Sequence, residues 1–167
     1  MVGFVLGPPS AGERTMSLPL EGLHSGLSAG TAMLGSVRTA VRFDPLTPRT
    51  ITSAALGVAL ARAHRGTMSG ESRPALIAFG VSRPVRTLTL AEPAAFGPLV
   101  LSRIAVRVGD GGAANTIREA DADPDEVLAA AKGKPGRAGL LIGRDLLGRC
   151  SSLVFDKPAK VVRLTCA

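Results

Sequence analysis

Asp44 is the residue of this chain whose position best suits chemistry. It directly follows an apolar stretch, Val37 to Phe43, and precedes Pro45 and Leu46. A carboxylate held at the end of a strand can serve as a general acid or base. A single aspartate before proline is, however, ordinarily a turn residue whose side chain binds nearby backbone. Both interpretations of Asp44 stay open until a larger pattern is considered.

Motifs for several other chemistries are missing. The glycine-rich stretch Gly139 to Gly148 has neither the Gly-Lys-Ser/Thr of a phosphate loop nor a Gly-x-Gly-x-x-Gly pattern. There is no Gly-x-Ser-x-Gly nucleophile elbow. His24 and His64 lie far apart, and Cys150 and Cys166 lack metal-ligand spacing. We therefore expect no metal site and no cofactor.

Short apolar stretches separated by turn residues predict an all-β or mostly β domain. In Val37 to Phe43 the apolar side chains alternate with Arg38, Ala40 and Arg42, as in a half-buried strand. The expected strands are Leu18 to Leu20, Thr31 to Leu34, Val37 to Phe43, Leu76 to Val81, Val85 to Leu90, Leu99 to Val108, Leu140 to Ile142, Leu153 to Phe155 and Val161 to Leu164.

Three short helices are expected within this β pattern. They cover Thr52 to Arg65, Asp123 to about Lys132, and one turn within Gly143 to Gly148. A chain of 167 residues suits a single domain. The composition of residues 1–16, rich in Gly, Pro and Ser, predicts a flexible lead-in, so we place the domain at residues 17–167.

Four segments together resemble the retropepsin-like aspartic peptidases, the bacterial relatives of retroviral proteases. Leu141-Ile-Gly-Arg-Asp-Leu-Leu147 resembles the hydrophobic-Gly-Arg-Asn/Asp-Leu-Leu element of that family. Val41 to Leu56 is similar to the segment in which a strand ends in the catalytic aspartate. Phe96 to Val108 and Leu153 to Leu164 are similar to the strand pair before the glycine element and to the terminal hairpin. The resemblance implies a closed β-barrel of the acid-protease fold.

The resemblance also implies a reaction and a partner. Members carry one catalytic aspartate per chain and form a two-fold dimer, in which one carboxylic acid and one carboxylate share a site. Asp44 would then be catalytic in a homodimer that hydrolyses peptide or protein substrates, and Pro74 to Arg86 would form the flap hairpin over the substrate. The substrate-binding residues expected from the resemblance are Leu46, Thr47, Phe79, Gly80 and Ile142.

The sequence departs from the family at the catalytic motif. Asp-Thr-Gly is here Asp44-Pro45-Leu46. Pro45 has no hydroxyl and no backbone N–H, and Leu46 adds a side chain where the family has only hydrogen. Arg49 brings a positive charge that favours an ionised aspartate. We therefore keep a second hypothesis, a non-catalytic peptide-binding or assembly module on the same fold.

The chain carries a net charge of +7, mostly from arginine. Its arginines are scattered, and base-stacking aromatics are scarce, with no Trp or Tyr and five Phe. This pattern favours a solvated basic surface over a nucleic-acid site. No apolar run reaches the roughly 20 residues of a membrane span. Val2 to Leu6 is apolar but lacks the basic flank of a secretory signal. The given sequence therefore predicts a cytoplasmic location, and a periplasmic one if a signal peptide precedes it.

Cys150 and Cys166 stand at equal distances from Pro158, in the loop of an expected hairpin. Directly opposed cysteines in an antiparallel pair come within reach of a disulfide. In a reducing cytoplasm they would remain thiols.

Overall fold

The computed structural model describes residues 2–21, 29–78, 81–108 and 138–167. Phe79 and Gly80, the expected tip of the flap, lie outside the described residues. So does the segment 109–137, which includes the expected helix from Asp123 to about Lys132.

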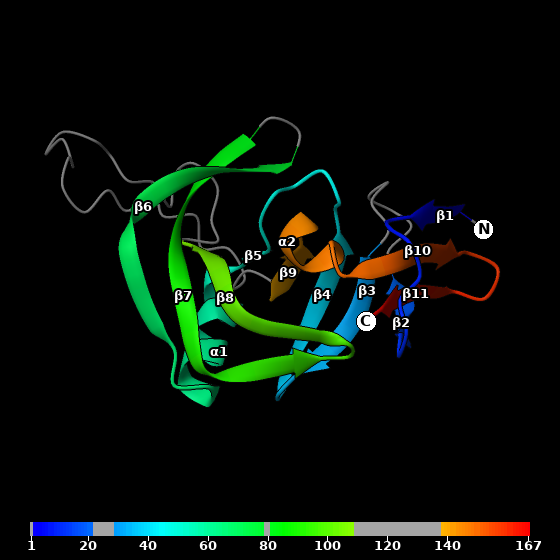
Figure 1. Ribbon diagram of the computed structural model, residues 1–167. Helices are drawn as coiled ribbons and strands as arrows, with labels where there is room; N and C mark the ends of the chain where they lie inside the picture. The colour runs from blue at the N-terminus through cyan, green and yellow to red at the C-terminus, as the bar shows by residue number, and fades with distance from the viewer. Residues whose placement is uncertain (1, 22–28, 79–80, 109–137) are drawn as a thin grey trace, which may run out of the picture.

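The described part of the chain is mostly β, as the sequence predicts (Figure 1). The elements are β1 (Val2–Val5), β2 (Arg14–Glu21), β3 (Ala29–Leu34), β4 (Val37–Phe43), β5 (Ile51–Thr52), α1 (Ala54–Ala63), β6 (Thr67–Ala78), β7 (Val81–Phe96), β8 (Leu99–Arg107), β9 (Gly139–Ile142), α2 (Arg144–Leu147), β10 (Cys150–Asp156) and β11 (Val161–Cys166). The strand order is β1-β10-β11-β2-β3-β4-β9-β5-β8-β7-β6. No hydrogen bonds join β1 to β6 within the described residues, so the expected closed barrel is not confirmed.

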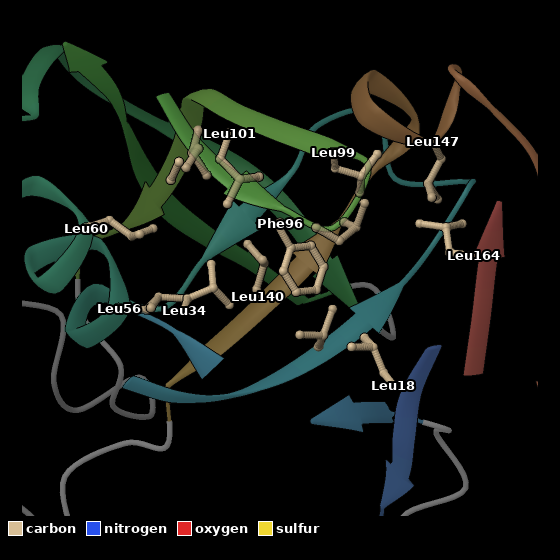
Figure 2. Close-up of a cluster of buried hydrophobic side chains, with 14 of the residues drawn as sticks. Leu18, Leu34, Leu56, Leu60, Phe96, Leu99, Leu101, Leu140, Leu147 and Leu164 are labelled. Atoms are coloured by element: carbon tan, nitrogen blue, oxygen red, sulfur yellow. The ribbon is translucent and has the colours of Figure 1, made fainter. Parts of the chain in front are cut away.

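The main core lies on one face of the central strands. In β4, Thr39 and Val41 are fully buried whereas Arg38, Ala40 and Arg42 are exposed, which confirms the predicted alternation. Helix α1 covers this buried face and contacts β4, β7 and β8. Figure 2 shows the resulting cluster, which includes Leu18, Leu34, Leu56, Leu60, Phe96, Leu99, Leu101, Leu140, Leu147 and Leu164.

Helix α1 begins later than expected because Thr52 belongs to β5, a two-residue strand that the sequence pattern does not reveal. The Ser53 hydroxyl oxygen caps the helix by accepting a hydrogen bond from the backbone N–H of Leu56 at 3.3 Å. A Cβ atom on Gly57 would lie 2.4 Å from the Val106 side chain, so glycine permits the close approach of helix and sheet. Neither described helix is long and apolar enough to cross a membrane.

The expected lead-in contains a strand. β1 pairs antiparallel with β10, and β2 already begins at Arg14. The apolar residues of β1 supply the physical reason, because Phe4 packs edge-to-face on Phe155 with ring centroids 6.1 Å apart. The Gly and Pro residues that suggested a lead-in instead connect β1 to β2.

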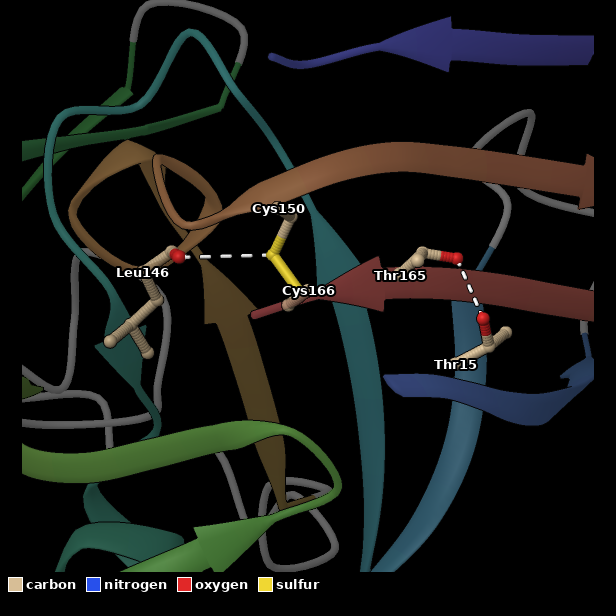
Figure 3. The surroundings of a disulfide bond; sticks show 5 residues. All are labelled: Thr15, Leu146, Cys150, Thr165 and Cys166. Atoms are coloured by element: carbon tan, nitrogen blue, oxygen red, sulfur yellow. Dashed lines mark hydrogen bonds between the residues drawn. A yellow bond between two sulfur atoms is a disulfide. The ribbon is translucent and has the colours of Figure 1, made fainter. Parts of the chain in front are cut away.

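The C-terminal hairpin forms as predicted from β10 and β11. Cys150 and Cys166 lie directly opposite each other in its ladder and form a disulfide (Figure 3). Both cysteines are buried in the main core. Strand β2 pairs with the other side of β11, where the hydroxyl groups of Thr15 and Thr165 are hydrogen-bonded at 2.8 Å.

Asp156 fixes the turn of this hairpin. Its carboxylate accepts hydrogen bonds from the Arg163 guanidinium at 2.7 Å and from the Ala159 N–H at 3.1 Å. The Arg163 hydrogen bond, followed by that of Ala159, lowers the pKa of Asp156 below its ordinary value. The contribution of Asp156 to stability is therefore present above the ordinary carboxylate pKa and is lost as the pH falls through the lowered value.

The disulfide generates a prediction about stability. Because the bridge closes a loop with a sequence separation of 16, reduction is expected to lower the free energy of unfolding by roughly 3 kcal/mol. Urea denaturation with and without reductant measures this difference. The double variant Cys150→Ala/Cys166→Ala serves as the control and should not respond to reductant. Two freely alkylated thiols in the oxidised, purified protein would contradict the bridge.

Candidate functional site

Asp44 is held at the end of β4 by three hydrogen bonds, one from its backbone N–H and two to its carboxylate. The backbone N–H of Asp44 donates to the carbonyl of Ile142 at 3.0 Å, which extends the β4–β9 ladder by one step. One carboxylate oxygen, Oδ1, accepts a hydrogen bond from the Leu46 N–H at 2.9 Å. The other, Oδ2, accepts one from the Thr47 hydroxyl at 2.7 Å. Asp44 is half-buried, so its carboxylate has a fixed orientation and remains within reach of solvent.

These contacts agree with both interpretations of Asp44. The Leu46 contact is the hydrogen bond of an Asx turn, in which an aspartate binds the backbone two residues on. A catalytic carboxylate also needs its rotamer fixed by neighbouring donors. The geometry of one chain therefore shows a carboxylate with a fixed orientation, with Thr47 as the side chain that orients it.

The loop after Asp44 rests directly on the glycine of the Leu-Ile-Gly-Arg-Asp motif. A Cβ atom on Gly143 would lie 2.5 Å from both the carbonyl carbon and the carbonyl oxygen of Arg49, and 2.9 Å from the backbone carbonyl oxygen of Thr47. The Arg144 N–H donates to that same carbonyl oxygen of Thr47 at 2.8 Å. Residue 143 must therefore be glycine for the loop to keep this position.

A hydrogen-bond network fastens the end of the loop to the first turn of α2. The Thr50 N–H and hydroxyl donate to the two carboxylate oxygens of Asp145, at 2.9 and 2.7 Å. The Thr50 hydroxyl oxygen in turn accepts from the Gly143 N–H at 3.1 Å. Thr50 is fully buried, so its N–H and hydroxyl would be costly to leave without a partner. Sequence reasoning identified the Gly-Arg-Asp motif but missed the role of Thr50.

The structure brings together only some of the expected site residues. Asp44 and Thr47 are in contact, and Leu46 contributes its N–H while its side chain is 87% exposed. Ile142 requires a correction, because its side chain is fully buried in the main core and cannot contact a peptide there. It contributes its carbonyl, which holds Asp44.

The neighbour of Ile142 faces the opposite side of the sheet. Leu141 packs against a second, smaller cluster whose buried members are Ile51, Val85 and Ala105, with Ala75 at its border. Leu141 is in register with Arg42 of β4 and with Ile51 of β5. The period-2 alternation of β9 predicts that Leu141 and Ile142 face opposite sides of the sheet. It does not indicate which of the two sides is the main core.

The expected flap segment forms a hairpin. β6 and β7 pair antiparallel at Pro74 with Pro84, and the pairing continues to Ala78 with Val81. Its tip, Phe79 and Gly80, lies outside the described residues, so their expected contact with substrate stays a prediction.

No group of three or more His, Cys, Asp or Glu within the described ranges is arranged to hold a metal ion.

Among known proteins, neither a protein-family model nor a curated protein matches the sequence. A retropepsin-like aspartic protease from Rickettsia conorii, known from a crystal structure, aligns with a TM-score of 0.49 and 15% identity, covering 92% of each chain.

The close contact at Gly143 predicts a large effect of a single methyl group. Gly143→Ala is expected to lower the free energy of unfolding by about 2 kcal/mol or more, because the atoms that the methyl meets belong to the backbone. Gly3→Ala is the matched control, since its Cβ would meet only Val154 at an ordinary 3.6 Å. Equal stability of the two variants in urea denaturation would contradict the contact.

The Thr50–Asp145 network predicts coupling between two residues far apart in sequence. Thr50→Val and Asp145→Ala should each cost about 1.5–3 kcal/mol, because each leaves buried polar groups without a partner. The double variant should cost less than the sum by about 1 kcal/mol. Asp145→Asn, which keeps one carbonyl oxygen, should cost less than Asp145→Ala. Strictly additive losses would show that the two side chains act independently.

Proposed function

We propose that this chain is a retropepsin-like aspartic peptidase, in which two copies of Asp44 meet across a homodimer to hydrolyse a peptide bond. The observation that carries the proposal is the Asp44 carboxylate, oriented through both oxygens by Leu46 and Thr47. The glycine contact and the Asp145 network, which fix the loop, support it further. Such a rigid setting suits a group that must be placed to within about 0.5 Å.

The chemistry of the proposal requires both carboxyl groups. Two carboxylates a few ångströms apart share one proton, because both cannot be ionised at that distance. The ionised member removes a proton from a water molecule, whose oxygen attacks the peptide carbonyl, while the protonated member donates its proton to the carbonyl oxygen. Collapse of the tetrahedral intermediate breaks the C–N bond as a proton passes to the leaving nitrogen.

A second chain is the proposed source of the second carboxyl group. Asp145, the other aspartate near the loop, has both oxygens occupied by Thr50 and is thereby committed to holding the loop.

A specific observation also favours the second candidate, a peptide-binding module with little catalysis. In a dimer that brings the two Asp44 loops together, the exposed Leu46 side chains would compete for the space between them. Pro45 supplies neither a hydroxyl nor an N–H to join the loops. We therefore propose weak hydrolysis, limited by the separation of the two carboxyl groups.

Activity measurements distinguish the two candidates. We expect little cleavage of peptides at mildly acidic pH by the unmodified chain, and none by Asp44→Asn. Pro45→Thr combined with Leu46→Gly should raise the rate by about 10-fold or more, because small errors in placement cost up to about 100-fold.

The control is Asp44→Asn in the Pro45→Thr/Leu46→Gly background, which should remove the gain. Robust, pepstatin-sensitive cleavage by the unmodified protein would contradict the proposed weakness. Cleavage that persists in Asp44→Asn would overturn the assignment of Asp44.

A further inference from the structure

The face of the sheet opposite the main core has its own chemistry. Paired residues share a face, and the registers place Arg42, Leu141, Ile51, Ala105 and Thr87 in one row across five strands. We call this side of β4, β9, β5, β8, β7 and β6 the outer face. It carries the smaller apolar cluster, and α1 packs on the other side.

Arginines surround that cluster. Arg73 and Arg107 flank Val85 in one row, and Arg83 is paired with Ala75. Arg103 lies on the same side of β8 as Ala105. We call Arg42, Arg73, Arg83 and Arg103 the arginine rim. Arg42, Arg73 and Arg103 are exposed, whereas Arg83 is half-buried.

Acidic side chains are scarce among the described residues around this rim. The in-register positions of the six strands hold no Asp or Glu within the described residues. Glu71 and Glu92 lie where the register breaks, and Glu92 is paired with Arg65 at 3.4 Å. Across the described ranges no salt bridge involves Arg42, Arg73, Arg83 or Arg103.

Two arginines of the rim lie close enough to bind one extended ligand together. Arg73 and Arg83 are diagonal neighbours on β6 and β7, at a spacing of about 7–8 Å between their Cα atoms. This spacing matches that of carboxylates along an extended peptide, where every second residue advances about 7 Å.

Asp44 belongs to this same face. It follows Arg42 by two residues, and its N–H continues the β4–β9 ladder to Ile142, so the alternation extends to it. We propose that the arginine rim binds acidic residues of the peptide presented to Asp44, so that the substrate class is an acidic peptide. This inference rests on the proposed function.

An acidic peptide fits the outer face better than a nucleic acid does. Guanidinium groups bind carboxylates through paired hydrogen bonds. Base stacking needs aromatic side chains, and none occupies an in-register position of the outer face within the described residues.

Fluorescence anisotropy tests the proposal without any need for cleavage. The full chain carrying Asp44→Asn is titrated into a labelled decapeptide with Asp and Glu around two aliphatic residues, and into its Asn/Gln counterpart. We expect the acidic peptide to bind about 10-fold more tightly at low salt, with the preference reduced at high salt. Equal affinity for the two peptides would overturn the proposal.

Matched arginine variants locate the binding. Arg73→Ala/Arg83→Ala should weaken binding of the acidic peptide about 10-fold. Arg14→Ala/Arg62→Ala removes the same charge from exposed positions off the outer face, and should weaken it no more than about 2-fold, as expected for screened long-range charge. Equal losses in both pairs, or tighter binding of a DNA duplex that depends on the rim, would contradict the proposal.

The outcomes for the rim and for Asp44 are separable. Anisotropy reports on the rim in a chain that cannot use Asp44, so selective binding of the acidic peptide would stand even if cleavage proved independent of Asp44. Conversely, cleavage that requires Asp44 but shows no preference between the two peptides would overturn the rim alone.

Discussion

The contact between Gly143 and the backbone of the Asp44 loop is the constraint on which the site depends. No side chain fits at residue 143, because the carbonyl group of Arg49 lies where its Cβ would be. The approach is held by the Asp145 carboxylate on Thr50, which joins segments 95 residues apart. Since backbone groups, the buried Thr50 and the exposed Asp145 all make these contacts, displacement of the loop would break several of them together.

Strand alternation then divides the chemistry between two faces of one sheet. Neighbouring residues in β9 face opposite sides of the sheet: Ile142 lies in the main core, and Leu141 borders the smaller cluster on the outer face. The main core supplies the rigidity, and the outer face carries Asp44 together with the arginine rim. A shift of one residue in the β4–β9 register would exchange these roles.

Local patterns predicted β4 and the C-terminal hairpin, but the expected strand Leu76 to Val81 is divided between β6 and β7. The bounds of β4 and the pairing of Cys150 with Cys166 follow from alternation and from symmetry about a turn. β5 was not predicted because two residues are too few to show a periodic pattern. β1 was not predicted because the Gly and Pro residues that follow it indicated a loop. The Thr50–Asp145 network and the burial of Ile142 depend on contacts between distant segments, which composition and spacing do not encode.

The central claim is that two Asp44 carboxyl groups meet across a two-fold axis. The separation of their nearest oxygen atoms in a crystal structure of the dimer tests it most directly. The account predicts a pair bridged by one water molecule, with nearest oxygen atoms farther apart than the roughly 2.5–3.0 Å of a direct hydrogen bond, because the exposed Leu46 side chains would occupy the space between the loops. A chain that stays monomeric at high concentration, or a dimer whose Asp44 side chains lie on remote surfaces, would contradict the account.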